Sequence, residues 1–246
     1  RPRVEGITLM LVIVVLLAIA FDYVNGFHDT ANAIATSVAT RALSPRNAIL
    51  MAAAFNFIGA FAGTAVAKTI GSGLVNEDTT TLAVVAAALI GAITWNLITW
   101  WLGLPSSSSH ALIGGLLGAT IIAAGTEALN VNGIWNKVIV PMFTSPFFGF
   151  VIAFAFMIAL YWVFRRARRK PMAVRFRKLQ VFSAAFMAFA HGSNDAQKTM
   201  GIITLALFSA GVIDDFTVPT WVIVVSATAL SLGTAVGGWR IMKTMG

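Results

Sequence analysis

The sequence contains no cysteine and few charged residues. Of its 246 residues, only 11% are charged. The missing thiols exclude a disulfide framework, a cysteine nucleophile and a thiolate metal site. A soluble domain carries about 25% charged residues because its surface faces water, so this chain cannot cover a soluble surface. Instead, 58% of its residues are hydrophobic and the mean hydropathy is +0.85, which predicts a protein surrounded by lipid.

The positive charges are concentrated in one short stretch. The formal net charge is +8, and eight of the 17 basic residues lie in the run RRARRKPMAVRFRK at 165–178. Cytoplasmic loops of membrane proteins carry an excess of Lys and Arg. We therefore interpret this run as a cytoplasmic loop that can also contact anionic lipid. Outside it, no basic surface interleaved with aromatic residues remains, which argues against a nucleic-acid partner.

Hydrophobic stretches long enough to cross a bilayer recur along the chain, since a membrane helix needs about 20 mostly apolar residues. They predict an all-α, multi-pass integral protein of the cell membrane, with spans near 7–25, 47–68, 80–102, 108–125, 139–164, 180–209 and 220–239. If the chain crosses the membrane seven times and the basic run is cytoplasmic, the N-terminus lies outside. The basic pairs Arg41/Arg46 and Arg240/Lys243 then lie inside, and the acidic pairs Glu77/Asp78 and Asp214/Asp215 lie outside. Arg1 and Arg3 do not fit this pattern, and several stretches can instead be re-entrant hairpins.

Three polar clusters interrupt the apolar stretches, namely NGFHDTANAIAT at 25–36, PSSSSH at 105–110 and HGSNDAQK at 191–198. A charge at bilayer depth costs at least a few kcal/mol, so Asp29, Asp195 and Lys198 are expected to face a cavity or a partner. Isolated polar groups often only tie helices together, but three clusters that hold all three histidines favour a functional site. We expect the helices to break at Gly26 and Gly192, where unwound backbone would line a cavity.

The first and third clusters resemble each other. Gly26-x-x-Asp29 and Gly192-x-x-Asp195 share a pattern, and the expected topology makes their segments run in opposite directions. This is typical of an inverted repeat that holds its substrate near the membrane midplane. We therefore divide the chain into a first repeat at 1–164, the basic loop at 165–178 and the start of a second repeat at 179–246. Because the first residue is Arg1 rather than Met and the last, Gly246, closely follows Arg240 and Lys243, we expect both ends to be cut. A counterpart of the serine cluster would fall beyond this chain, so we expect half of the site to be missing.

Serines beside carboxylates predict transport of an oxyanion together with a cation. Hydroxyls and free N–H groups at a helix N-terminus bind anions, although simple N-capping explains such serines as well. Asp29 and Asp195 can bind Na⁺, accept protons or hold a metal that travels with the anion. A protonated Asp can also distinguish hydrogen phosphate from sulfate, yet a sulfate permease remains an alternative. A passive channel and an intramembrane hydrolase are more remote, the latter because the sequence shows no activated nucleophile.

Four strings, GFHDTANAIAT, GLPSSSSHALIG, HGSNDAQKTMGI and GGWRIMKTMG, resemble the PiT family of inorganic phosphate transporters. The resemblance runs from about residue 20 to the end. It implies an all-helical fold with two inverted repeats and phosphate uptake driven by an ion gradient, without enzymatic activity. Carried over by motif, the residues expected to bind phosphate or its coupling ion are Asp29, Asn32, Ser107, Ser108, Ser109, Asn194, Asp195 and Lys198.

The second half departs from the sodium-coupled pattern at Lys198, because sodium-coupled members usually repeat the Asn that the first half has at Asn32. The Gln-Lys form resembles the bacterial proton-coupled branch, which carries phosphate as a neutral metal complex, so we favour H⁺ over Na⁺. Candidate proton carriers are His28, His110 and His191, since an imidazole titrates near physiological pH, although structural roles fit them equally well. We expect no cofactor and no resident metal, leave open a homodimer, and expect Lys68 and Lys137 to snorkel at span ends.

Overall fold

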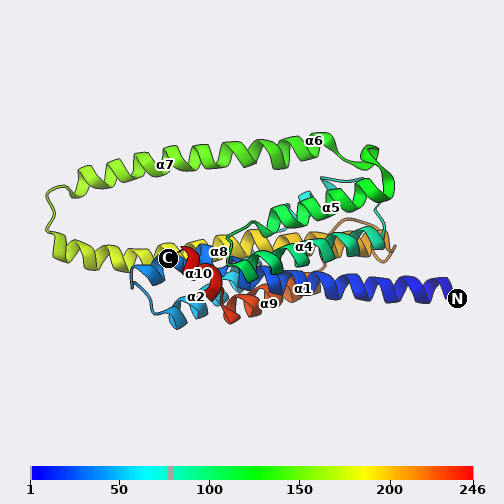
Figure 1. The fold of residues 1–246 in the computed structure, drawn as a ribbon, viewed down its shortest axis with the longest axis horizontal. Coiled ribbons are helices and arrows are strands. Elements are labelled where there is room, and N and C mark those ends of the chain that lie inside the picture. Colours follow the sequence, from blue (N-terminus) through cyan, green and yellow to red (C-terminus); the bar gives the residue numbers. More distant parts are fainter. Residues whose placement is uncertain (1, 77–79, 246) are drawn as a thin grey trace.

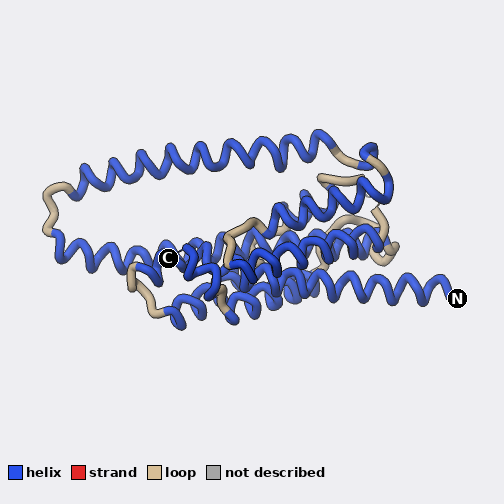
Figure 2. The backbone as a smooth tube through the Cα atoms, viewed as in Figure 1, coloured by secondary structure: helices blue, strands red, loops and turns tan. Residues whose placement is uncertain are grey.

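Helices account for nearly all of the described chain. The computed structural model describes residues 2–76 and 80–245, and these form helices joined by short turns (Figure 2), with an isolated bridge between Val75 and Leu129. The elements are α1 (Pro2–Ala39), α2 (Pro45–Gly59), α3 (Ala65–Ser72), α4 (Leu82–Leu102), α5 (Ser108–Ala124), the 3₁₀ turn η2 (Thr126–Ala128), α6 (Val131–Ile134), the π-helix η3 (Trp135–Ile139), α7 (Val140–Phe164), α8 (Arg169–Ser209), α9 (Thr220–Val236) and α10 (Trp239–Met245). The all-α prediction is confirmed.

The loop that carries the serine cluster lies between two clear helix signals. α4 ends at Gly103, whose φ of 68° lies in the left-handed region that glycine adopts without steric cost. α5 begins after Ser107, whose hydroxyl accepts a hydrogen bond from the backbone N–H of His110 at 3.2 Å. Residues 103–107 therefore form a tight connection between two neighbouring apolar helices, and the N-terminus of α5 lies at its end.

Two helix pairs cross in the core of the bundle. α1 packs against α9, α8 packs against α2, and α1 and α8 contact each other while they run in opposite directions (Figure 1). The α4–α5 hairpin packs on α1 mainly through α4. Each long helix of one half thus packs on a shorter helix of the other half, as an inverted repeat would produce. The repeat boundaries themselves remain a prediction.

Gly26 and Gly192 do not break their helices, contrary to the prediction, because α1 and α8 are continuous through them. They allow close helix crossings instead. A Cβ on Gly26 would lie 3.0 Å from Cα of Gly233 in α9, and one on Gly192 would lie 2.5 Å from Cα of Asn56 in α2. Small residues are what lets membrane helices approach this closely. The interruptions lie elsewhere, at 60–64 between α2 and α3 and at 237–238 between α9 and α10.

The predicted spans agree with the helices only in part. Three described segments are long and apolar enough to cross a membrane, namely Leu9–Ala39, Leu82–Leu102 and Val131–Phe164, while α5 and α9 are shorter apolar helices. The span expected at 47–68 is divided between α2 and α3, and the one expected at 180–209 is the later part of α8. The count of seven crossings remains a prediction. Of the charges used to orient it, Arg1, Glu77 and Asp78 lie outside the described residues.

The basic run is mostly helix rather than loop, which corrects the prediction. Only residues 165–168 separate α7 from α8, and α8 contains the rest of the run. Arg165 lies over the ring of Trp162, 4.8 Å from its centroid, a geometry in which the ring face attracts the cation. α7 stands apart from the other long helices (Figure 1), and none of its side chains is buried. Its composition suits contact with lipid.

Candidate functional site

The carboxylates of the two related motifs meet inside the bundle. Asp29 of α1 and Asp195 of α8, together with His191 of α8, each offer one side-chain atom, and these atoms all lie within 4.8 Å of one another. Asp29 and Asp195 are 6% and 8% exposed. Because α1 and α8 run in opposite directions, the same short motif delivers its carboxylate from two sides to one place. Two carboxylates and an imidazole this close together are chemically suited to holding a cation.

Asp29 is held by hydrogen-bond donors from two helices. Its Oδ2 lies 2.5 Å from the hydroxyl of Ser108, at the start of α5, and its Oδ1 lies 2.7 Å from Nδ1 of His28. On the far side of its ring, Nε2 of His28 lies 3.0 Å from the hydroxyl of Thr99. Because a carboxylate oxygen accepts, we assign a ring proton to Nδ1 of His28. This hydrogen bond orients the Asp29 carboxyl group.

The four serines of the loop have four different surroundings. Ser106 donates to the Thr99 hydroxyl at 3.0 Å, and Ser107 is the N-cap of α5. Ser108 is buried and contacts Asp29, whereas Ser109 lines a cavity. Ser107 was predicted to line the anion site, but the structure shows that its side chain caps the N-terminus of α5.

Asp195 is paired with a buried ammonium. Nζ of Lys198 lies 2.8 Å from Oδ2 of Asp195, and Nε2 of His191 lies 3.3 Å from the same oxygen. Nδ1 of His191 lies 3.0 Å from Oδ1 of Asn56. The Asn56 amide is fixed in this orientation because its Nδ2 donates to the Thr234 hydroxyl at 2.8 Å. His191 therefore lies between the amide of Asn56 and the carboxylate of Asp195, and its Nε2 has no hydrogen-bond partner among the described residues.

A cavity of about 410 Å³ adjoins Asp195 and is bordered by α3, α5, η3 and α8. Its polar lining consists of Thr69, Ser109, Lys137, Asn194, Asp195 and Lys198. Two ammonium groups, two hydroxyls and an amide provide the donors that an oxyanion needs. These hydrogen-bond donors lie directly beside the carboxylate cluster.

Two predicted site residues lie outside this arrangement. Asn32 is exposed on α1, and His110 is exposed at the start of α5. Asn194 is also exposed and donates to the backbone oxygen of Ala190 at 2.8 Å, although it borders the cavity. The structure therefore brings Asp29, Asp195 and Lys198 together with Ser108 and Ser109, but not with Asn32 or His110.

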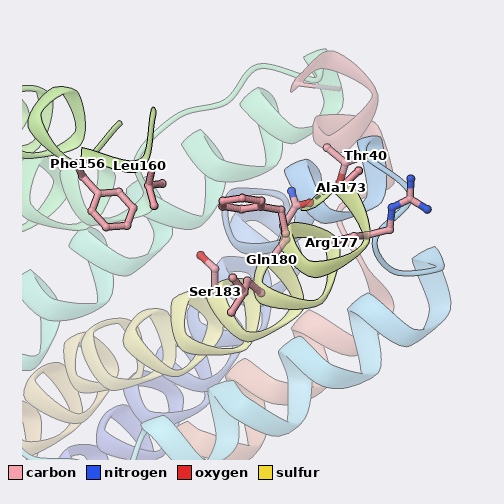
Figure 3. A pocket seen from close by; sticks show the side chains of 9 residues that line it. Thr40, Phe156, Leu160, Ala173, Arg177, Gln180 and Ser183 are labelled. Atoms are coloured by element: carbon pink, nitrogen blue, oxygen red, sulfur yellow. Dashed lines mark hydrogen bonds between the residues drawn. The ribbon is translucent and has the colours of Figure 1, made fainter. Parts of the chain in front are cut away.

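A larger cavity, of about 650 Å³, lies between α7 and the first part of α8. Phe156 and Leu160 face Gln180, Ser183 and Arg177 across it (Figure 3). Its lining is mostly apolar and includes none of the predicted site residues. The smaller, polar cavity is therefore the candidate site.

Comparison with known proteins gives the arrangement a family. Residues 25–246 match the family model described as the phosphate transporter family (PHO4). The chain belongs to this family. It is 48% identical over 97% of its length to a probable low-affinity inorganic phosphate transporter of Bacillus subtilis, of which it covers 72%. It is 49% identical over 96% of its length to the protein of that description from Mycobacterium tuberculosis strain H37Rv, but covers only 57% of it.

A solved structure described as a sodium-dependent phosphate transporter has the same fold. It matches with a TM-score of 0.81 over 96% of this chain and 77% of the other, at 22% identity. At this identity the likeness concerns the fold alone. Membership in the phosphate transporter family confirms the predicted family, the multi-pass membrane class and the absence of an enzymatic role.

The sequence analysis did not single out two polar residues of this family member that lie in or near the site. Lys137 was expected at a span end, but it lines the polar cavity and lies on a π-helix, an irregularity frequent at functional sites. A Cβ on Gly73 would come 2.9 Å from its Nζ, so the glycine leaves room for the ammonium. Asp22 lies within the expected span at 7–25 and is fully buried. Its spacing of seven residues from Asp29, two helical turns, was the signal for it.

Proposed function

We propose that this member of the phosphate transporter family moves inorganic phosphate across the membrane by secondary active transport driven by a proton gradient. The observation that supports this most is that a cavity suited to an anion adjoins a carboxylate cluster suited to a cation. A cavity lined by Ser109, Lys137 and Lys198 adjoins the carboxylates Asp195 and Asp29. An oxyanion fits the first part and a proton or other cation fits the second, so their transport can be linked by electrostatics.

Phosphate would lie against the donors of the cavity. The hydroxyl of Ser109 and the ammonium groups of Lys137 and Lys198 would bind its oxygens, since charge-assisted hydrogen bonds are the stronger ones. The carboxylate of Asp195 can accept a hydrogen bond from hydrogen phosphate, whereas sulfate has no such donor at neutral pH. Asp29, Ser108, Asn194 and, from its motif, Asn32 complete the proposed substrate and ion set, whereas Ser107 is left out because its hydroxyl is the N-cap of α5.

Lys198 supports H⁺ rather than Na⁺ as the coupling ion. Its ammonium already supplies a positive charge 2.8 Å from Asp195, in the place where a bound Na⁺ would otherwise neutralise that carboxylate. His191, whose ring lies 3.3 Å from the Asp195 carboxylate and 3.0 Å from the Asn56 amide oxygen, is the histidine best placed to carry a proton, while His28 orients Asp29 and His110 lies outside. A divalent metal that travels with phosphate would be cargo, not a resident cofactor.

Uptake of radiolabelled phosphate by the full-length protein in liposomes tests this proposal. A pH gradient and a Na⁺ gradient are imposed separately, with a divalent metal present and with sulfate as a competitor. We expect uptake driven by the pH gradient, insensitive to sulfate, lost in Asp195→Asn and kept in Asp214→Asn, which changes an exposed carboxylate of the loop after α8. Uptake that needs Na⁺ would refute the coupling ion, and uptake suppressed by sulfate would refute the substrate.

A further inference from the structure

Asp22 is a buried carboxyl group with no assigned role. It is 0% exposed, and neither of its oxygens has a hydrogen-bond partner among the described residues. It precedes Asp29 by two turns on the same face of α1, and Asn25 lies between them, one turn from each. An ionised carboxylate in such surroundings is strongly disfavoured, whereas the neutral acid is tolerated.

The groups around Asp22 contribute little positive charge. Its polar neighbours are the hydroxyl of Thr199 and the amide of Asn25, and the charges that act on it are Asp195 and Lys198 of α8. Lys198 is already paired with Asp195 at 2.8 Å, so it does not neutralise Asp22.

The other helices that contact α1 add no compensating charge next to Asp22. α4 and α9 carry no charged or titratable side chain, α5 carries the exposed His110, and α2 and α10 carry basic residues only. On α1 itself, His28 is engaged with Asp29. A proton is therefore the cation best suited to neutralise this carboxylate.

Asn25 and Ser108 lie between Asp22 and Asp29, and Ser108 contacts both Asn25 and Asp29. The Ser108 hydroxyl lies 2.6 Å from Oδ1 of Asn25 and 2.5 Å from Oδ2 of Asp29, yet a hydroxyl has one hydrogen to donate. The contacts can be satisfied in two ways. In one, Asp29 is protonated and donates to Ser108, Ser108 donates to Oδ1 of Asn25, and the Asn25 N–H₂ faces an ionised Asp22.

In the other arrangement the Asn25 amide is turned round. Its N–H₂ donates to Ser108, Ser108 donates to an ionised Asp29, and the amide oxygen of Asn25 faces a protonated Asp22. Each arrangement holds one proton, on Asp29 in the first and on Asp22 in the second. The orientation of the Asn25 amide distinguishes them, and Nδ2 of Asn25 has no hydrogen-bond partner among the described residues.

We propose that Asp22 is a proton-binding site of the transport cycle, and that Asn25 and Ser108 link its protonation to that of Asp29. The inference rests on the proposed proton coupling and names the residue that performs it. Asp22 takes a proton from water on one side of the membrane as –COOH and releases it to water on the other side as –COO⁻. Three buried carboxyl groups, Asp22, Asp29 and Asp195, lie near the ammonium of Lys198 and the imidazole of His191, and bound phosphate adds negative charge that a proton on Asp22 offsets.

The test compares two kinds of transport by the full-length protein in liposomes. Accumulation of radiolabelled phosphate under a pH gradient requires a coupled proton, whereas exchange of external labelled phosphate for internal phosphate at equal pH does not require net proton movement. In Asp22→Asn we expect accumulation to fall at least tenfold and exchange to stay within about threefold of the unmodified protein. In Asp22→Glu, which keeps the carboxyl group, both activities persist, and in the exposed control Asp214→Asn both are unchanged.

The outcomes separate this inference from the proposed function. If the unmodified protein shows no pH-driven accumulation, the proposed coupling fails. If it accumulates phosphate and Asp22→Asn does so equally, or if a folded Asp22→Asn loses exchange as well, Asp22 is not a proton site separate from phosphate binding. Should Asp22→Asn fail to fold, infrared spectroscopy decides. The band of a protonated buried carboxyl group is expected to shift in Asp22→Glu, and a band that is the same in both proteins overturns the inference.

Discussion

Replacing Lys198 by methionine removes the ammonium of a buried ion pair and keeps most of the side-chain volume. The side chains of Lys198 and Asp195 are 5% and 11% exposed, and Nζ lies 2.8 Å from Oδ2. Removal of one partner from such a pair leaves an uncompensated charge and costs about 3–5 kcal/mol of folding free energy. Removal of both charges, in Asp195→Asn/Lys198→Met, leaves no such charge. We therefore expect the double variant to be more stable than the sum of the two single changes predicts.

The assay is a double-mutant cycle on purified protein in detergent, with unfolding followed by tryptophan fluorescence and helicity. We expect Lys198→Met to lose about 3–5 kcal/mol and the cycle to show a coupling energy of about 2–3 kcal/mol, at the upper end for residues in contact. Lys178→Met is the matched control, since Lys178 is exposed on the same helix and its loss should change stability by about 0.5 kcal/mol or less. Additive single effects would show that the pair is not held in this geometry.

Two further changes test the helix crossing and the serine loop. Gly192→Ala places a methyl group against the backbone of Asn56 and should destabilise the protein by about 1–3 kcal/mol. The control Gly149→Ala in α7, where nothing lies within 4 Å of the added methyl group, should not destabilise it. Equal stability of the two variants would contradict the close crossing. Ser108→Ala removes the hydroxyl between Asn25 and Asp29 and should abolish pH-driven phosphate uptake. Ser107→Ala removes only the N-cap, so it should cost about 1 kcal/mol of stability with uptake retained, and the reverse pattern would exchange the roles of the two serines.

The sequence predicted the site correctly where its residues form a recognisable motif. Asp29 and Asp195 were paired from a four-residue repeat, and the structure places them together because α1 and α8 cross in opposite directions. Gly26 and Gly192 were misread because glycine permits both a broken helix and a close helix crossing, and only the packing partner distinguishes these. Lys137 was missed because a lysine at a span end has the same pattern whether it faces lipid head groups or an internal cavity.

Because α1 and α8 are continuous at their charged residues, different parts of the fold supply different chemical groups to the site. An uninterrupted helix satisfies its own backbone groups, so α1 and α8 offer only side chains to the site, chiefly the carboxylates of Asp29 and Asp195 with Lys198 and His191. Free backbone donors must come from a helix end, and the loop at 103–107 provides one where α5 begins, with Ser108 reaching Asp29. In the proposed mechanism, the two crossing helices bind the cation, and the hairpin tip with the cavity beside it binds the anion. Movement of the α4–α5 hairpin relative to α1 would change both sites at once, because the Ser108–Asp29 contact joins them.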